Sequence, residues 1–375
     1  MKKIPFMSQL KIKKRTKGEL LSYSIEIFIY TFFYSLRKVI YPMMKKYYRG
    51  PGKKFACSAA KRYAEKKDIF IPRYIFLEST NLCNASCICC PHDKMTRPKE
   101  VMPWDLFKLI IDECKTFSEN GLKKIFLNKD GEPLLDPLLI ERIEYIKHNI
   151  PSVSLHLNSN AMCLDEEKAA RLLDSALDSI TFTVNGASRE TYETIMRGLD
   201  YHLVKGNLER FFELKADRNS RLKVSMQIVV CDKNIHEVQK YNRQWFGKAD
   251  SFVLKSMHNF FNMGTSIMTD KLSGDQLRFC AEPFEGLFIY CNGDLGLCCW
   301  DYDNLTGLGN VSKHGILNLY NNSRKLNDIR AAMLKMDCRN TYPCNRCSLS
   351  YGLDKNTILN ALKRRLFGGS NVAFL

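Results

Sequence analysis

The sequence of 375 residues predicts an α/β fold: a partial, TIM-like (βα)6 barrel, followed by a small cysteine-rich module and preceded by an amphipathic helical segment. Between residues 70 and 260, six short β-rich runs alternate with amphipathic runs, which is typical of parallel sheets with helical crossovers. Seven cysteines gather between residues 280 and 350, and the first 55 residues are basic and aromatic. Because six units are fewer than the eight of a complete barrel, we expect an open or partial barrel.

The expected strands are the runs rich in β-branched and aromatic residues: Tyr74–Ser79, Lys124–Asn128, Val153–Leu157, Ser179–Val184, Lys223–Val230 and Ser251–Lys255. The expected helices are the runs with helical spacing of apolar residues: Pro103–Phe117, Pro137–Asn149, Leu164–Ser175, Arg189–Met196, Leu203–Leu214 and Ile235–Phe246. The predicted domains are an N-terminal segment (1–55), the barrel (70–260), the cysteine-rich module (275–350) and a C-terminal tail (351–375).

Residues 20–48 are rich in aromatic and apolar side chains. The apolar residues recur at helical spacing, and basic residues lie at both ends of the segment. No stretch of 18 uncharged apolar residues occurs, which argues against a helix that spans a membrane. Two interpretations stay open. The segment is either an interfacial helix on an anionic membrane or a helix packed on the body of the protein. The expected location is the cytoplasm, and the first interpretation adds a peripheral position at the inner face of the membrane.

The net charge of +17 is unevenly distributed along the chain. Residues 1–55 carry 14 Lys and Arg but 2 Glu, whereas the remaining residues carry 43 basic and 38 acidic side chains. A nearly balanced body argues against nucleic acid as the partner. The 15 cysteines are odd in number and clustered, which favours metal or iron–sulfur ligation over a disulfide framework.

The first cysteine group, Cys83, Cys87 and Cys90, has the spacing Cys-x3-Cys-x2-Cys directly after the first expected strand. Three thiolates on one loop can hold three irons of a [4Fe–4S] cluster. The fourth iron is then open to a substrate or cofactor. A structural zinc site and a conventional four-ligand cluster are the alternatives, with Cys89 or His92 as the fourth ligand.

This spacing after the first strand of a partial barrel resembles the radical S-adenosylmethionine (SAM) superfamily. Three later motifs match the family in the expected order. Asp130-Gly131-Glu132-Pro133 resembles the Gly-Glu motif that binds the amino group of SAM, and Asn158-Ser159-Asn160 resembles the motif that holds its carboxylate. The segment from Asn185 to Ser188 resembles the fourth-strand segment near the ribose. The resemblance implies that these residues bind SAM: Gly131, Glu132, Pro133, Asn158, Ser159 and Asn185.

Two residues depart from the family pattern. Asn185 stands where the family usually has Asp, and Cys89 occupies a slot before the third cluster cysteine that is usually aromatic. No fifth-strand motif for the adenine is visible.

The second cysteine group resembles the SPASM/twitch extension of radical SAM enzymes, because Cys280-x12-Gly293-x4-Cys298 matches its opening. No cysteine follows Cys347, so eight thiolates for two auxiliary clusters are not evident. The resemblance implies one auxiliary [4Fe–4S] cluster, with four ligands: Cys280, Cys298, Cys344 and Cys347. Several alternatives remain: Cys299 in place of Cys298, participation of Cys291 or Cys338, and a zinc ribbon.

The resemblance implies an enzyme with two [4Fe–4S] clusters that reductively cleaves SAM to a 5′-deoxyadenosyl radical, which abstracts hydrogen from the substrate. We expect an oxidoreductase that dehydrogenates a small molecule, a sugar or a lipid-linked substrate, similar to the aminocyclitol dehydrogenase of butirosin biosynthesis. Flavodoxin or ferredoxin is the expected reductant, and the sequence identifies no general base. A peptide-modifying maturase is the first alternative, and a non-catalytic iron–sulfur or zinc module is the second.

Overall fold

The computed structural model describes residues 9–13, 60–61, 63–65, 69–258, 260–262 and 279–347. The helix predicted within residues 20–48 and the tail predicted at 351–375 lie outside the described residues. In the described part of the chain, no helix is long and apolar enough to cross a membrane.

The described strands form one sheet in the order β1-β7-β6-β5-β4-β3-β2-β8-β9. Every pair from β7 to β8 is parallel, and the two edge pairs are antiparallel. The strands are β1 (Gln9–Lys13), β2 (Tyr74–Leu77), β3 (Lys124–Phe126), β4 (Ser154–Ser159), β5 (Ser179–Thr183), β6 (Lys223–Val230), β7 (Ser251–Ser256), β8 (Gly286–Ile289) and β9 (Leu295–Gly296). This α/β fold with a largely parallel sheet is consistent with the predicted partial barrel.

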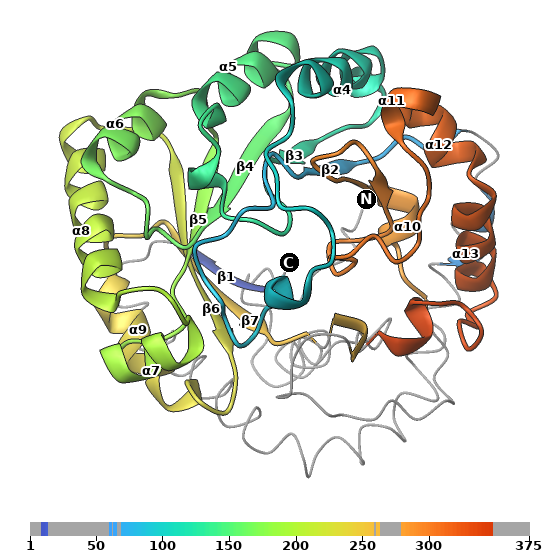
Figure 1. The fold of residues 1–375 in the computed structure, drawn as a ribbon. Helices are drawn as coiled ribbons and strands as arrows, with labels where there is room; N and C mark the ends of the chain where they lie inside the picture. Colours follow the sequence, from blue (N-terminus) through green and yellow to red (C-terminus); the bar gives the residue numbers. More distant parts are fainter. Residues whose placement is uncertain are drawn as a thin grey trace, which may run out of the picture.

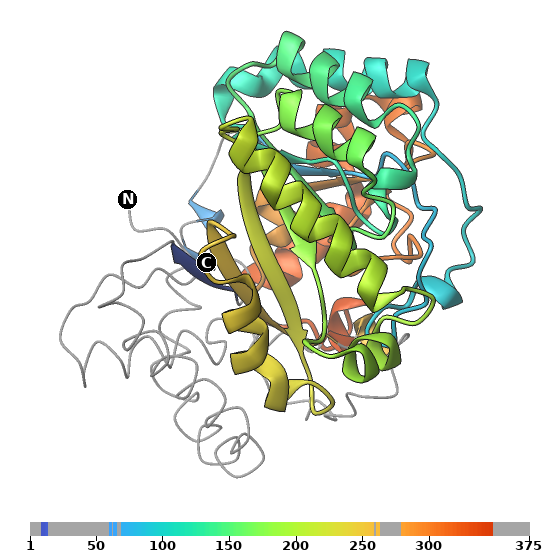
Figure 2. The same ribbon diagram turned by 90° about the vertical axis from the view of Figure 1, so that its left-hand side faces the viewer.

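The helices surround the curved sheet (Figure 1), and Figure 2 shows α8 lying across the strands from the side. The barrel helices are α4 (Trp104–Phe117), α5 (Leu139–Asn149), α6 (Glu166–Asp174), α7 (Arg189–Ile195), α8 (Tyr201–Asp217) and α9 (Val238–Trp245). The C-terminal module adds α10 (Glu282–Glu285), α11 (Val311–His314), α12 (Ile316–Asn322) and α13 (Arg324–Leu334). Side-chain caps mark four of these starts, where the side chains of Asp165, Ser188, Asp200 and Asn310 accept from Lys168 N, Thr191 N, Leu203 N and Ser312 N, respectively.

All six predicted strands are present, with ends that differ by at most two residues from those expected. The structure adds two connections that the sequence did not predict. Strand β8 lies within the predicted cysteine-rich module, yet it pairs in parallel with β2 and extends the barrel sheet. Strand β1 pairs with β7 at the opposite edge. The module and the barrel therefore share one sheet.

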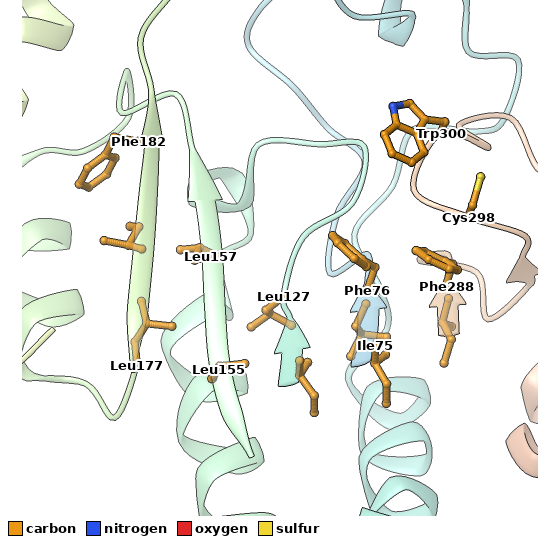
Figure 3. Packing of buried hydrophobic residues seen from close by; sticks show 14 of the residues in the cluster. Ile75, Phe76, Leu127, Leu155, Leu157, Leu177, Phe182, Phe288, Cys298 and Trp300 are labelled. Carbon is orange, nitrogen blue, oxygen red and sulfur yellow. The ribbon is translucent and has the colours of Figure 1, made fainter. Parts of the chain in front are cut away.

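The two faces of the sheet differ in chemistry because strand side chains alternate. On β4, the aliphatic Leu155 and Leu157 alternate with His156 and Asn158. The aliphatic face belongs to the continuous apolar core, part of which Figure 3 shows across β2, β4 and β8. The helices lie outside the sheet (Figure 1), so the inward face carries His156 and Asn158 on β4 and, by register, the rings of Phe76, Phe126 and Phe288 on the neighbouring strands.

A buried charge network joins the barrel to the C-terminal module. Glu78, just after β2, accepts two hydrogen bonds from the Arg97 guanidinium, at 2.8 and 2.9 Å, and a third from Cys291 N at 3.0 Å. Arg97 also donates from Nε to Tyr302 O at 2.9 Å and lies 4.2 Å from the centre of the Tyr290 ring. Burial alone would raise the pKa of Glu78, but Arg97 holds it below its usual value.

We predict that Arg97→Met lowers the free energy of unfolding by about 3–5 kcal/mol, because it leaves the buried Glu78 carboxylate without its charge partner. Urea denaturation of the reconstituted protein measures the loss. The matched control is Arg171→Met, which breaks an exposed ion pair with Glu141 at 3.1 Å and should cost about 1 kcal/mol or less. Equal losses in the two variants would contradict a structural role for the Glu78–Arg97 pair.

Candidate functional site

The loop after β2 is held against the connection between α7 and α8. Ser86 N donates to Arg197 O at 2.8 Å, and Ile88 N donates to Ile195 O at 2.9 Å. His92, near the end of the loop, is buried, and its Nε2 lies 2.7 Å from a backbone carbonyl oxygen. These bonds fix the course of the segment that carries the first cysteine group.

Cys83, Cys87 and Cys90 are partly buried on this loop and are not in disulfide bonds. Burial raises the pKa of Cys83 to about 11, and burial together with the neighbouring Cys89, Cys90 and Cys83 raises that of Cys87 well above its usual value. The thiols of this loop therefore affect one another's ionisation. Among the described residues, no three Cys, His, Asp or Glu side chains converge on one point as they stand, so the thiols must turn inward and ionise to hold a cluster.

The Gly131-Glu132 segment, six residues after the middle of β3, packs directly on the start of this loop. Glu132 N donates to Leu82 O at 2.7 Å. A Cβ atom on Gly131 would lie 2.4 Å from Thr80 O and 2.7 Å from Leu82 O, which no real side chain tolerates. Glycine is therefore required here by the close approach of two backbones.

The Glu132 carboxylate accepts hydrogen bonds from Ser159 Oγ at 2.8 Å, Asn160 N at 2.7 Å and Leu134 N at 3.1 Å. Burial nevertheless raises the pKa of Glu132 to about 7, because three neutral donors do not replace the lost hydration. The predicted cofactor residues Glu132 and Ser159 are thus in direct contact at the carboxyl ends of β3 and β4.

Pro133 and Asn158 lie beside this pair. Pro133 opens the 3-10 turn Pro133–Leu135, and Asn158 donates from its backbone to Asn128 Oδ1 at 2.9 Å. The structure therefore gathers five of the predicted cofactor residues at one edge of the sheet, where parallel α/β folds bind ligands: Gly131, Glu132, Pro133, Asn158 and Ser159.

Asn185, the sixth predicted cofactor residue, follows β5 and is buried. Its Oδ1 accepts from Val229 N at 2.8 Å, and its Nδ2 lies 3.7 Å from Cys89 Sγ. The two departures from the family pattern are therefore in contact. An Asp side chain would supply no donor toward the sulfur, whereas the Asn amide does.

Glu237, which the sequence did not single out, anchors the loop after β5. Its carboxylate accepts from Ala187 N at 2.6 Å, from Ser188 N at 3.2 Å and from Ser188 Oγ. No local spacing signals this contact, since Glu237 lies about fifty positions further along the chain.

The second cysteine group is more deeply buried than the first. The exposed fractions are 8% for Cys280 and Cys298, 5% for Cys344 and 2% for Cys347. Burial raises the pKa of Cys280 well above its usual value, with contributions from Glu282, Cys344 and Cys347, and Cys347 contributes likewise at Cys298. Cys280 thus interacts electrostatically with Cys344 and Cys347, and Cys298 with Cys347, and a set of four buried thiols suits a closed four-ligand cluster.

Of the three alternative ligands, Cys291 and Cys338 have other contacts, whereas Cys299 shares neighbours with Cys298. Cys291 is buried beside the Arg97 network, and its thiol lies 3.6 Å from Glu100 Oε1. Cys338 Sγ lies 3.3 Å from Met333 Sδ. At Cys299, burial and Glu282 raise the pKa, whereas Lys255 and Lys129 oppose the shift. Cys299 also acts on the ionisation of Cys298 and shares Glu282 with it, so Cys299 stays an alternative to Cys298 as a ligand.

His258 is a neighbour of the second cysteine group that the sequence did not predict. Its Nε2 lies 3.5 Å from Cys347 Sγ, and its ring stacks on Trp300 with 4.3 Å between centroids. His258 follows β7, far in sequence from both residues, so no motif spacing could have revealed it.

The chain matches the radical SAM superfamily model over residues 77–242 and the model of SPASM, an iron–sulfur cluster-binding domain, over residues 280–348. The chain belongs to the radical SAM superfamily and carries a C-terminal SPASM domain. Membership implies SAM and [4Fe–4S] clusters as cofactors. Both cysteine groups described above fall within the matched ranges of this radical SAM protein.

Known proteins resemble this radical SAM protein in part. A probable GTP 3′,8-cyclase of Methanothermobacter marburgensis is 33% identical over 131 residues, which is 35% of this chain and 41% of the relative. The chain spans half or less of the length of the curated relatives it matches.

Two solved structures have a similar fold. BtrN in complex with AdoMet and 2-DOIA has a TM-score of 0.53 and 16% identity, with 76% of this chain and 99% of that chain covered. Streptococcus suis SuiB bound to precursor peptide SuiA has a TM-score of 0.57 and 14% identity, with 73% and 70% covered.

We predict that Gly131→Ala prevents iron binding at the first cysteine group, because a Cβ atom there would displace the backbone of the loop at Thr80 and Leu82. Iron per chain after anaerobic reconstitution should fall by about four, the content of one cluster. Gly206→Ala is the matched control, since a Cβ atom on Gly206 in α8 meets nothing within 4 Å. Full iron content in Gly131→Ala would show that the loop tolerates the displacement.

We also predict that SAM affinity increases with pH through the pKa of Glu132, about 7. Because this pKa lies above the usual value, Glu132 is mostly neutral at pH 6 and attracts the amino group of SAM only weakly. Its ionised fraction rises from about one tenth at pH 6 to about nine tenths at pH 8, so affinity should rise up to about tenfold. Calorimetric titration under anaerobic conditions measures the effect.

Glu132→Gln is the control. Its side chain does not ionise, so any pH dependence of the SAM affinity that remains in this variant comes from SAM itself. Parallel pH profiles for Glu132→Gln and the wild type would show that Glu132 ionisation does not control binding.

Proposed function

We propose that this radical SAM protein is an oxidoreductase that removes hydrogen from a hydroxyl-rich small molecule or sugar. In this proposal, the catalytic [4Fe–4S] cluster is held by Cys83, Cys87 and Cys90. SAM is held by Gly131, Glu132, Pro133, Asn158, Ser159 and Asn185. One auxiliary cluster is held by Cys280, Cys298, Cys344 and Cys347, and the reductant is flavodoxin or ferredoxin.

The cluster and SAM, when bound, supply a 5′-deoxyadenosyl radical that can remove hydrogen from an unactivated carbon. The chain must hold that substrate carbon close to the radical and exclude water from the site. Glu132 and Ser159 would orient the amino and carboxylate end of SAM, and the loop contacts at Arg197 and Ile195 would keep the first cysteine group in place.

The inward face of the barrel carries this proposal. His156 Nδ1 lies 2.7 Å from Ser179 Oγ, and its Nε2 lies 3.2 Å from Thr181 Oγ1. On the next pair of strands, Gln227 Nε2 donates to Thr183 Oγ1 at 3.0 Å. These imidazole, hydroxyl and amide groups both donate and accept, which matches the hydrogen bonding of a sugar or polyol.

Lys255, at the carboxyl end of β7, supports a substrate position between the two cysteine groups. It is partly buried, and in the described part of the chain it pairs with no carboxylate. Its positive charge opposes the burial-driven rise in pKa at both Cys89 and Cys299. The direction of these two effects is the basis for placing Lys255 beside the substrate in this proposal.

The proposal is tested by assaying 5′-deoxyadenosine formation with a panel of polyols, aminocyclitols, sugars and peptides. The panel covers both substrate classes because the similar structures were solved with 2-DOIA in one case and a precursor peptide in the other. Turnover with polyols or sugars, with a product oxidised by two electrons relative to the substrate, would support the proposal. Turnover with peptides alone would favour a maturase, and no SAM cleavage would favour a binding module.

We predict that Gln227→Leu lowers substrate-dependent 5′-deoxyadenosine formation at least about tenfold, because one lost hydrogen bond to substrate with a buried partner left unpaired costs more than 1 kcal/mol. The matched control is Met226→Leu on the aliphatic face of the same strand, which should retain activity. Iron content and melting temperature should be unchanged in both variants. Equal activity in Gln227→Leu and the wild type would remove the inward face from the substrate site.

A further inference from the structure

His258 is held firmly in place beside the auxiliary cysteine group. Its exposed fraction is 8%, and its ring lies on Trp300 with an interplanar angle of 29°. Figure 3 shows Trp300 near Cys298, so the histidine and the cysteines share one buried region. The ring stacks on Trp300 and has Phe260 and Phe261 at its edges, so each of its two nitrogens has a defined neighbour.

The neighbours of His258 assign its tautomer. Phe260 N donates to His258 Nδ1 at 2.8 Å, so Nδ1 must present a lone pair. The proton of the neutral ring is then on Nε2. This nitrogen is the one that lies 3.5 Å from Cys347 Sγ, so the N–H group is directed at the sulfur.

We propose that His258 is a positioning residue that donates a hydrogen bond from Nε2 to the sulfur of Cys347 and raises the reduction potential of the auxiliary cluster. The inference rests on the proposed function, in which Cys347 is a cluster ligand. One-electron reduction adds a negative charge to the cluster and its thiolates. A donor at a ligand sulfur stabilises the more negative reduced state, while the proton stays on Nε2.

This bond has a direct consequence for the proposed oxidation. The 5′-deoxyadenosyl radical takes the hydrogen atom and becomes 5′-deoxyadenosine. The substrate radical then loses one electron to the auxiliary cluster and its hydroxyl proton to solvent, which completes a net two-electron oxidation to a carbonyl. A more positive reduction potential of the auxiliary cluster makes this electron transfer from the substrate radical more favourable. His258 therefore acts on the acceptor of the electron and does not touch the substrate.

The test uses the full-length chain with Cys83→Ala, Cys87→Ala and Cys90→Ala, so that the auxiliary cluster is observed alone. Its midpoint potential is measured by a redox titration followed by electron paramagnetic resonance. His258→Phe keeps an aromatic ring on Trp300 and removes the donor, and His258→Gln restores an amide donor. We expect about four irons per chain in all three proteins, a more negative potential in His258→Phe, and partial recovery in His258→Gln.

The outcomes separate this inference from the proposed function. An unchanged potential in His258→Phe, with four irons retained, overturns the role of His258 alone. Absence of iron from the triple cysteine variant overturns the auxiliary cluster and, with it, this inference. Strong nitrogen hyperfine coupling that disappears in His258→Phe would identify His258 as a ligand and overturn the hydrogen-bond role.

Discussion

The parallel pairing of β8 with β2 is the interaction on which both cysteine groups depend. The first group follows β2 directly, and the second lies on both sides of β8, with Cys280 before it and Cys298 after β9. Register between the two strands therefore fixes where the groups lie relative to each other. The Glu78–Arg97 pair reinforces this register, because Glu78 N also donates to Ile289 O at 2.9 Å and its carboxylate binds Cys291 N. A shared sheet with a buried ion pair is stiffer than two domains joined by a linker.

Much of the barrel could be predicted because each element carries its own signal. Strands such as Lys223–Val230 are rich in β-branched residues, and the Cys83 group has a spacing that few other functions require. Strand β8 was missed because Gly286–Ile289 is a four-residue apolar run among cysteines, and its parallel partner β2 lies far away in sequence. His258, Lys255 and Glu237 were missed for the same reason. Their partners are brought near by the fold, and no local pattern encodes that proximity.

The contact between Asn185 and Cys89 gives a physical account of two sequence departures that are unrelated along the chain. A partly buried sulfur atom that lies beside a charged cluster, as proposed for Cys89, needs polar neighbours. Asn185 offers an amide donor at 3.7 Å, and Lys255 opposes the burial-driven rise in the Cys89 pKa. An Asp at position 185 would place a carboxylate against this sulfur and would raise the thiol pKa further. Asn185 and Cys89 are therefore compatible with each other, whereas an Asp at position 185 would be less compatible with Cys89.

The two cysteine groups differ in burial in the way that their proposed roles require. The cysteines of the first group are partly exposed, beside the polar residues that are proposed to bind SAM. Those of the second group are buried, and Cys347 lies against His258. A cluster with an open iron needs access for SAM, whereas a cluster with four thiolates needs to be enclosed for its potential to be set by protein hydrogen bonds. Burial also raises the thiol pKa values in the second group, so binding of iron there must release protons and couple cluster formation to folding of the module.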